Sequence, residues 1–149
     1  MTALINLIWF VFGGFLLGIA WYIIGLFFYI TIIGIPLGSV CFEFAKLSMF
    51  PFGKEVIRET ELKGKQNVSS LKKVFHVIIN IIWIPIGIIF TLAYLVLGII
   101  SFITIIGIPI GIVYVRMGQF LLFPVGARVV SKKQSYASAV AEEIERRHN

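Results

Sequence analysis

The chain has 149 residues, of which 59% are hydrophobic and 13% charged, and its formal net charge is +6. Soluble domains carry about 25% charged residues, and a soluble chain of this size has too much surface for so few charges to cover. The composition therefore argues against an ordinary soluble domain and predicts an integral membrane protein. The single cysteine, Cys41, excludes an internal disulfide.

The charged residues are segregated along the chain. Residues 2–42 and 74–115 contain none, and all 13 lysines and arginines fall within residues 46–73 and 116–147. Each uncharged run is about twice the roughly 20 residues that one bilayer crossing needs. Basic flanks mark the cytoplasmic side and can bind anionic lipid headgroups. We expect the bilayer and these headgroups to be partners, and no nucleic acid, because the basic residues lack a reader motif.

The first predicted element is a long helix over about residues 4–30, apolar on all sides. Gly34-Ile35-Pro36 follows it. Glycine ends helices cheaply, proline has no N–H to donate, and the residue before a proline disfavours helix. Proline is tolerated in a first helical turn, so a second helix is predicted from Pro36 to about Phe50. At about 22 Å it is short for a full crossing, which leaves open whether it spans the bilayer or is re-entrant.

The same pattern occurs twice, since residues 30–38 return as residues 103–111 with eight of nine identical. Other matches have an offset of 74 up to Gly13, which pairs with Gly87, and of 73 from Gly25 onward. One residue is therefore missing from the second copy between these points, and the chain is an internal duplication. The predicted domains are repeat 1 (1–56), a basic linker (57–73), repeat 2 (74–130) and a polar, helical tail (131–149).

The positions of the linker and the tail predict the topology. Both are basic, so both should be cytoplasmic, and each copy must then cross the membrane an even number of times. The predicted fold is an all-α integral membrane protein of two tandem helical hairpins, each a long helix, a Gly-Ile-Pro break and a shorter helix. We expect a multi-pass protein with cytoplasmic N- and C-termini, parallel repeats related by an axis along the membrane normal, and a loop over residues 54–73.

The two breaks are the first candidate functional elements. Irregular backbone inside a membrane must be buried in protein or face water. Thr31 and Thr104 can satisfy freed carbonyls there with their hydroxyls, and ligand binding is the alternative role. The break residues are Thr31, Gly34, Pro36, Gly38, Thr104, Gly107, Pro109 and Gly111.

Two further sets of polar residues recur in both copies. Glu43 and Arg116 occupy the same repeat position with opposite charge, which suggests a charge pair that gates or lines a polar path. The alternative is that each reaches lipid headgroups separately. The Asn-x-x-Trp motifs suggest interfacial anchors, with core packing as the competing role, and their residues are Asn6, Trp9, Asn80 and Trp83.

No pattern in the chain indicates an enzyme. His76 and His148 are far apart, and a lone cysteine without a nearby histidine is a poor nucleophile candidate. No cluster has metal-ligand spacing, and Gly-Ile-Pro-x-Gly lacks the lysine and the context of a phosphate-binding loop. We expect no catalytic residue, no cofactor and no metal.

The repeated motifs resemble the YccF family of small bacterial inner-membrane proteins. The resemblance rests on Asn-x-x-Trp, Thr-Ile-Ile-Gly-Ile-Pro-x-Gly and Pro-Phe-Gly-x-x-Val, and covers about residues 6–56 and 80–129. The second copy departs from it with Val125 in place of phenylalanine and with an added Pro85. The resemblance implies an inner-membrane protein with two copies of that domain, and it brings no catalytic residues.

Two functions remain open from the sequence. The first is a homo-oligomeric pore or transport-related protein in which the broken segments line a path. The second is a structural or accessory subunit that packs beside a larger membrane protein. The pore requires breaks that reach water, whereas the accessory role requires only lipid and protein contacts at the breaks.

Overall fold

The computed structural model describes residues 1–32, 34–63 and 68–148. The predicted helical class is confirmed, with the addition of one two-stranded ribbon. In chain order the elements are α1 (Thr2–Trp9), η1 (Phe10–Gly14), α2 (Phe15–Ile30), α3 (Ile35–Met49), β1 (Lys54–Arg58), α4 (Glu59–Lys63), α5 (Ser70–Ser101), α6 (Gly107–Leu122), β2 (Ala127–Ser131) and α7 (Lys132–His148).

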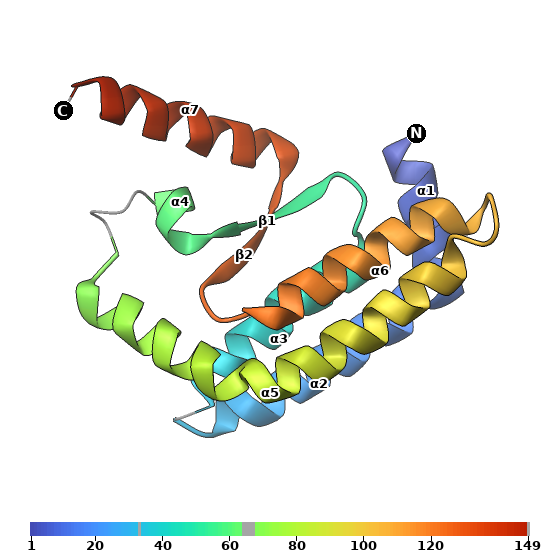
Figure 1. The fold of residues 1–149 in the computed structure, drawn as a ribbon, viewed down its shortest axis with the longest axis horizontal. Coiled ribbons are helices and arrows are strands. Elements are labelled where there is room, and N and C mark those ends of the chain that lie inside the picture. The colour runs from blue at the N-terminus through green and yellow to red at the C-terminus, as the bar shows by residue number, and fades with distance from the viewer. Residues whose placement is uncertain (33, 64–67, 149) are drawn as a thin grey trace.

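The two apolar helices of each copy pack along one another, α2 with α3 and α5 with α6 (Figure 1). Glycines let the backbones approach closely. A Cβ on Gly38 would lie 2.8 Å from the carbonyl oxygen of Gly25, and a Cβ on Gly111 would lie 2.9 Å from that of Gly98. Only glycine fits such a contact without displacing backbone. The 13-residue spacing between Gly25 and Gly38, and between Gly98 and Gly111, therefore reflects the same helix-crossing geometry in both copies.

The ribbon lies where a loop was predicted. β1 pairs antiparallel with β2, and α4 follows β1 directly. The loop prediction for residues 54–73 is therefore wrong over residues 54–63, and also over residues 70–73, where α5 has already begun. Residues 64–67 of the predicted linker lie outside the described residues. The polar, charged composition of this stretch concealed a strand that exists only because the distant second copy pairs with it.

The strand pairing also defines the relation between the copies. Val56 pairs with Val129, and these two valines occupy the same position of the repeat. A local two-fold axis therefore passes between them, perpendicular to the ribbon. The two copies also agree just after their strands. Glu61 accepts a hydrogen bond from the Arg58 N–H in the first copy, and Gln134 accepts one from the Ser131 N–H at the same positions of the second copy.

The two helix pairs point in opposite directions, not in parallel as predicted. Figure 1 shows the two breaks at opposite ends of the helices. Trp9, at the base of the first pair, packs edge-on against Tyr114 near the tip of the second, with ring centroids 5.8 Å apart. The physical reason is the antiparallel pairing of β1 with β2. The local two-fold axis is perpendicular to the plane of the ribbon, so a helix that runs along this plane in one copy runs in the opposite direction in the other copy.

The core lies between the two inner helices, α3 and α6, directly under the ribbon. Phe44 and Leu47 from α3 and Met117 and Leu121 from α6 are all 0% exposed. The Phe44 ring lies 5.3 Å from that of Phe120. The outer helices, α2 and α5, lie on the side away from the ribbon and expose wide apolar faces.

The extra residue of the first copy forms a kink between α1 and α2, within η1. Gly14, not Gly13, is the structural equivalent of Gly87, because a Cβ on either would meet a tryptophan indole and a backbone carbonyl oxygen. Gly13 is then the inserted residue; its φ is 155° and nothing lies within 4 Å of its Cβ position. The insertion gives the first copy a bend where the second copy has Pro85 inside α5.

Deletion of Gly13 should therefore be tolerated. The deletion restores an offset of 73 throughout and keeps Gly14 against Trp9, so we expect the free energy of unfolding to fall by less than about 1 kcal/mol. Deletion of the exposed Ile23 should cost more than about 3 kcal/mol, because it rotates Gly25 by about 100° relative to Gly18. Denaturant titration in detergent micelles measures both, and an equal loss for the two deletions would contradict the assignment of Gly13 as the insertion.

Candidate functional site

The asparagines of the repeated motif bind the turns that lead into the strands. The Asn80 amide donates to the Val125 carbonyl oxygen and accepts from the Val125 N–H, both at 2.9 Å. Asn6 makes the same two bonds with Phe52, at 2.9 and 3.0 Å. Each asparagine thus replaces a missing backbone partner and fixes where its strand begins.

The tryptophans of the motif bind the ends of the inner helices. Trp9 Nε1 donates to the Ser48 carbonyl oxygen at 2.6 Å, and Trp83 Nε1 to that of Leu121 at 2.9 Å. The last carbonyls of a helix lack intrahelical partners, so the indoles satisfy them. The structure therefore places Trp9 and Trp83 against the ends of the inner helices, and Asn6 and Asn80 against the turns that follow those helices.

The two breaks are closed by their own side chains. Thr31 Oγ1 donates to the Phe28 carbonyl oxygen at 3.0 Å and accepts from the Gly34 N–H at 3.1 Å. Thr104 accepts from the Gly107 N–H at 3.0 Å. The other break residues lie in the first two turns of α3 and α6, and proline is tolerated in the first of these turns; they are Pro36, Gly38, Pro109 and Gly111.

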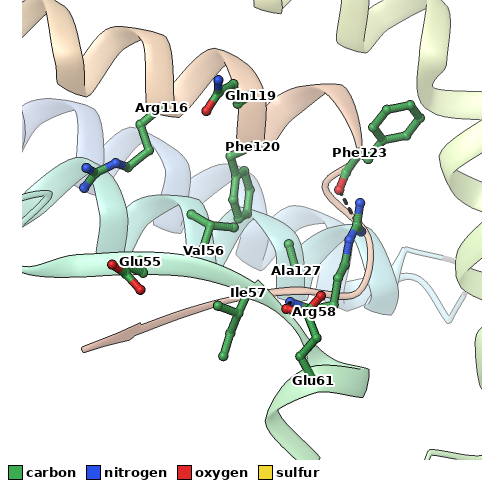
Figure 2. A pocket seen from close by; sticks show the side chains of 10 residues that line it. All are labelled: Glu55, Val56, Ile57, Arg58, Glu61, Arg116, Gln119, Phe120, Phe123 and Ala127. Atoms are coloured by element: carbon green, nitrogen blue, oxygen red, sulfur yellow. Dashed lines mark hydrogen bonds between the residues drawn. The ribbon is translucent and has the colours of Figure 1, made fainter. Parts of the chain in front are cut away.

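On the side of β1 the structure leaves an open pocket beneath the ribbon. Arg116 donates to the carbonyl oxygens of Lys54 and Pro51, at 3.0 and 3.3 Å. Beyond it lies a cavity of about 540 Å³ between β1 and α6. Figure 2 shows Arg116 and Glu55 at one end of this pocket and Arg58 at the other, where Arg58 donates to the Phe123 carbonyl oxygen at 3.1 Å.

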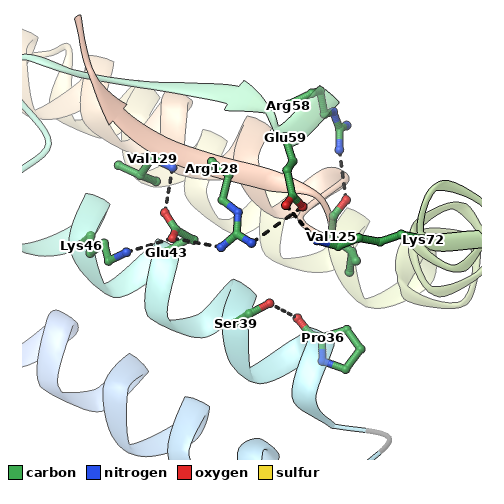
Figure 3. A network of polar contacts seen from close by, with 10 residues as sticks. All are labelled: Pro36, Ser39, Glu43, Lys46, Arg58, Glu59, Lys72, Val125, Arg128 and Val129. Carbon is green, nitrogen blue, oxygen red and sulfur yellow. Dashed lines mark hydrogen bonds and ion pairs between the residues drawn. The ribbon is translucent and has the colours of Figure 1, made fainter. Parts of the chain in front are cut away.

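On the side of β2 the corresponding position is closed by Glu43 (Figure 3). One carboxylate oxygen accepts from the Val129 N–H at 2.8 Å, and the other lies 2.9 Å from Lys46 Nζ and 3.4 Å from Arg128 Nη1. Glu43 is 6% exposed, so its charge is stabilised by these partners. Burial and the adjacent Lys46 lower the pKa of Lys54 from its ordinary value.

Arg128 extends this contact into a network. Its guanidinium also lies 3.7 Å from the Glu59 carboxylate, which in turn lies 2.8 Å from Lys72 Nζ. The network therefore joins α3, β2, α4 and α5 (Figure 3). Sequence reasoning missed Arg58, Glu59, Lys72 and Arg128, because the linker residues and Arg128 gain these partners only after the strands pair.

The predicted pair between Glu43 and Arg116 is replaced by two separate contacts. Glu43 lies against β2 and Arg116 against β1, so each reaches across to the strand of the other copy. The local two-fold axis explains this, because it places equivalent residues on opposite sides of the ribbon. The equal repeat position was a correct observation, and the inferred contact was wrong.

A double-mutant cycle distinguishes the two pairings. We expect Glu43→Ala and Arg128→Ala to be coupled by about 1–2 kcal/mol in the free energy of unfolding, because the two side chains are in contact. The matched cycle of Glu43→Ala with Arg116→Ala should give a coupling near zero. A larger coupling with Arg116 than with Arg128 would restore the sequence-based pairing.

The polar residues and the apolar helices indicate two different environments. Among the described residues, one helix, Ser70–Ser101, is long and apolar enough to cross a membrane, and two shorter apolar helices are Phe15–Ile30 and Gly107–Leu122. In the same residues no group of three or more His, Cys, Asp or Glu could hold a metal ion. The polar side chains described above lie on the ribbon side and carry charges of both signs.

The structure is a duplicated pair of apolar helices joined by a two-stranded ribbon. The family described as "Inner membrane component domain" matches residues 4–54 and 78–127. The chain is 36% identical over 143 residues to "Inner membrane protein YccF" of Escherichia coli (strain K12) and equally to that of Shigella flexneri, with 95% of each chain covered. The chain therefore belongs to the YccF family. No solved structure matches it.

Proposed function

We propose that this protein is an accessory subunit of the inner membrane, with a binding role and no enzymatic one. Its apolar helices would lie in the lipid, and the ribbon, α4 and α7 would form a cap in the cytoplasm. The observation that carries this proposal is the one-sided distribution of polarity. The ion-pair network lies on the ribbon side, whereas the outer helices expose Ile23, Leu26, Phe27, Ile89, Leu92 and Ile99, all more than half exposed.

The surroundings of the two breaks support contact with lipid rather than with a water-filled path. Ile32 is 86% exposed and Ile105 87% exposed, and no charged residue flanks either break. The threonine hydroxyls already satisfy the break backbone, so no water is needed there. The centre between α3 and α6 is filled by the fully buried core, which supports a packing role over a conduit through one chain.

The C-terminal helix supports a protein partner for the cap. Ser135, Ser138 and Glu142 are partly buried, whereas Tyr136, Val140 and Ile144 are 66%, 59% and 52% exposed. The three exposed residues recur every four positions, so they form one apolar stripe along α7. A stripe of this kind fits a groove on a partner. We place that partner in a larger membrane complex and assign anionic headgroups to the basic residues of the linker and the tail.

Native electrophoresis of the chain in mild detergent tests the accessory role. Produced at its natural level, the chain should migrate in an assembly larger than the purified chain forms alone. The triple substitution Tyr136→Ser, Val140→Ser and Ile144→Ser should release it from that assembly without removing it from the membrane fraction. Equal migration of the cellular and purified protein, together with ion flux through liposomes that contain only this chain, would instead support the homo-oligomeric pore.

Cysteine labelling in intact cells tests the proposed placement. In a chain with Cys41→Ser, single cysteines at Ile32, Ile105 and Ser138 should all be protected from a membrane-impermeant thiol reagent added outside. Ser138 should become reactive once the cells are opened, and the break positions should stay protected. Labelling of either break from outside would show that it crosses to the far surface.

A further inference from the structure

The two sides of the ribbon are equivalent by the local two-fold axis, but only one is closed. On the side of β2, α3 packs against the strand and the Glu43 carboxylate occupies the space between them. On the side of β1, the same space is the 540 Å³ pocket. The closed side therefore serves as a template for what the open side could bind.

The template identifies a backbone donor in the pocket. The ladder continues past both strand ends, where the Lys132 N–H donates to the Gly53 carbonyl oxygen and the Glu59 N–H to that of Gly126. Hydrogen-bonded and non-hydrogen-bonded residue pairs alternate in an antiparallel ladder. Val56 and Val129 therefore form a non-hydrogen-bonded pair, and their backbone N–H groups point away from the partner strand. The Val129 N–H meets Glu43. By the same geometry the Val56 N–H is directed into the pocket.

Comparison with the closed side also shows that the acidic and the basic residue have exchanged positions on the open side. Arg116 stands where the closed side has Glu43, and Glu55 stands where it has Arg128. On the closed side the two are paired. On the open side, within the part of the chain that the structure describes, Arg116 bonds only carbonyl oxygens and the Glu55 carboxylate has no hydrogen bond or ion pair. One end of the pocket therefore holds a cation, Arg116, and an anion, Glu55, whereas Arg58 and Glu61 lie at the other end (Figure 2).

We propose that this pocket binds the headgroup of a zwitterionic phospholipid that carries a primary ammonium, as in phosphatidylethanolamine. The phosphate accepts hydrogen bonds from Arg116 and the Val56 N–H, in the manner of the Glu43 carboxylate on the closed side. The ammonium donates to Glu55. Phe123, 42% exposed at the end of α6, lies against the apolar stem of the lipid.

The position of the pocket agrees with this ligand. The space is bounded by the cap on one side and an apolar helix on the other, which is where a headgroup meets a protein at the membrane surface. Gln119, exposed on the same face of α6 as Arg116, adds an amide donor for phosphate oxygens. The inference rests on the membrane placement proposed above, and it adds a ligand class to that proposal.

Native mass spectrometry of the purified full-length chain tests the site. The protein is loaded with equimolar phosphatidylethanolamine and phosphatidylcholine of the same acyl chains, because choline has no N–H to donate. We expect about tenfold more ethanolamine lipid to be retained, the ratio that one charge-assisted hydrogen bond supplies. Glu55→Gln should reduce the ratio to about one, and Arg116→Gln should reduce the retention of both lipids.

Two further variants separate the site from general effects. Arg116→Glu with Glu55→Arg reproduces the charges of the closed side, so this variant should fold and lose the preference. Glu143→Gln, on the exposed face of α7, should leave the preference unchanged. Equal retention of both lipids by the unaltered chain, or a preference that survives Glu55→Gln, would overturn the proposal. Free phosphoethanolamine, added as a competitor, should displace the lipid if the headgroup alone carries the recognition. None of these results depends on whether the chain joins a larger assembly.

Discussion

Replacement of Asn80 by alanine is expected to lower the free energy of unfolding by about 2–4 kcal/mol. The substitution removes two hydrogen bonds and leaves the N–H of Val125 without a partner, and each buried unsatisfied group costs about 1–3 kcal/mol. Asn80 is 9% exposed and Val125 is 2% exposed, so water cannot replace the lost amide. Denaturant titration of the purified chain in detergent micelles measures the loss.

The first copy provides a matched control. Asn6 makes the same two bonds with Phe52, but both residues are only partly buried. Water can reach the released backbone groups, so Asn6→Ala should cost about 1 kcal/mol. If both substitutions cost less than about 0.5 kcal/mol, the asparagines do not hold the turns that precede the strands. If the two costs are equal, burial is not what distinguishes the copies.

The sequence predicts the repeated features of this fold well, because each depends on residues close together in the chain. Ile30 ends α2 and α3 begins at Ile35, where glycine and proline interrupt the helix. The duplication was visible as near-identity of residues 30–38 and 103–111. Helix ends and breaks follow from local backbone sterics, and these are the same wherever the hairpin is placed.

The relation between the two copies could not be predicted from the sequence. It depends on the pairing of β1 with β2, which are separated by most of the second copy. Each strand is short and half polar, so neither has the alternating apolar pattern that identifies a strand. With the ribbon unknown, the basic linker favoured parallel repeats. The opposite direction of the hairpins, and the separation of Glu43 from Arg116, both follow from this one unrecognised pairing.

For the candidate sites, too, the residues could be predicted from the local sequence but their distant partners could not. The motif residues Asn6, Trp9, Asn80 and Trp83 were identified, but their partners are backbone atoms about 40 residues away. A backbone carbonyl has no sequence signature, so interfacial anchoring was an equally good prediction for these side chains. The pocket was missed altogether, because it arises from a difference between two halves that the sequence presents as equivalent.

The largest single effect is expected at the second break. A Cβ on Gly107 would collide with the carbonyl oxygen of Ser101, and a backbone atom cannot move aside as the end of a side chain can. Gly107→Ala should therefore open the break and lower the free energy of unfolding by about 3–4 kcal/mol. Gly34→Ala should behave alike, because its Cβ would collide with the Phe28 carbonyl oxygen in the first copy.

Gly118, on the same helix as Gly107, is the matched control for this substitution. Its Cβ would lie 3.3 Å from the Thr91 carbonyl oxygen and 3.4 Å from Tyr94 Cβ, so a methyl group needs only a small adjustment. Alanine also favours the helix over glycine by about 0.5–1 kcal/mol, and Gly118→Ala should be close to neutral. A comparable loss at both positions would mean that α6 tolerates no added volume, whereas a loss confined to Gly107 would show that the geometry of the break itself requires glycine.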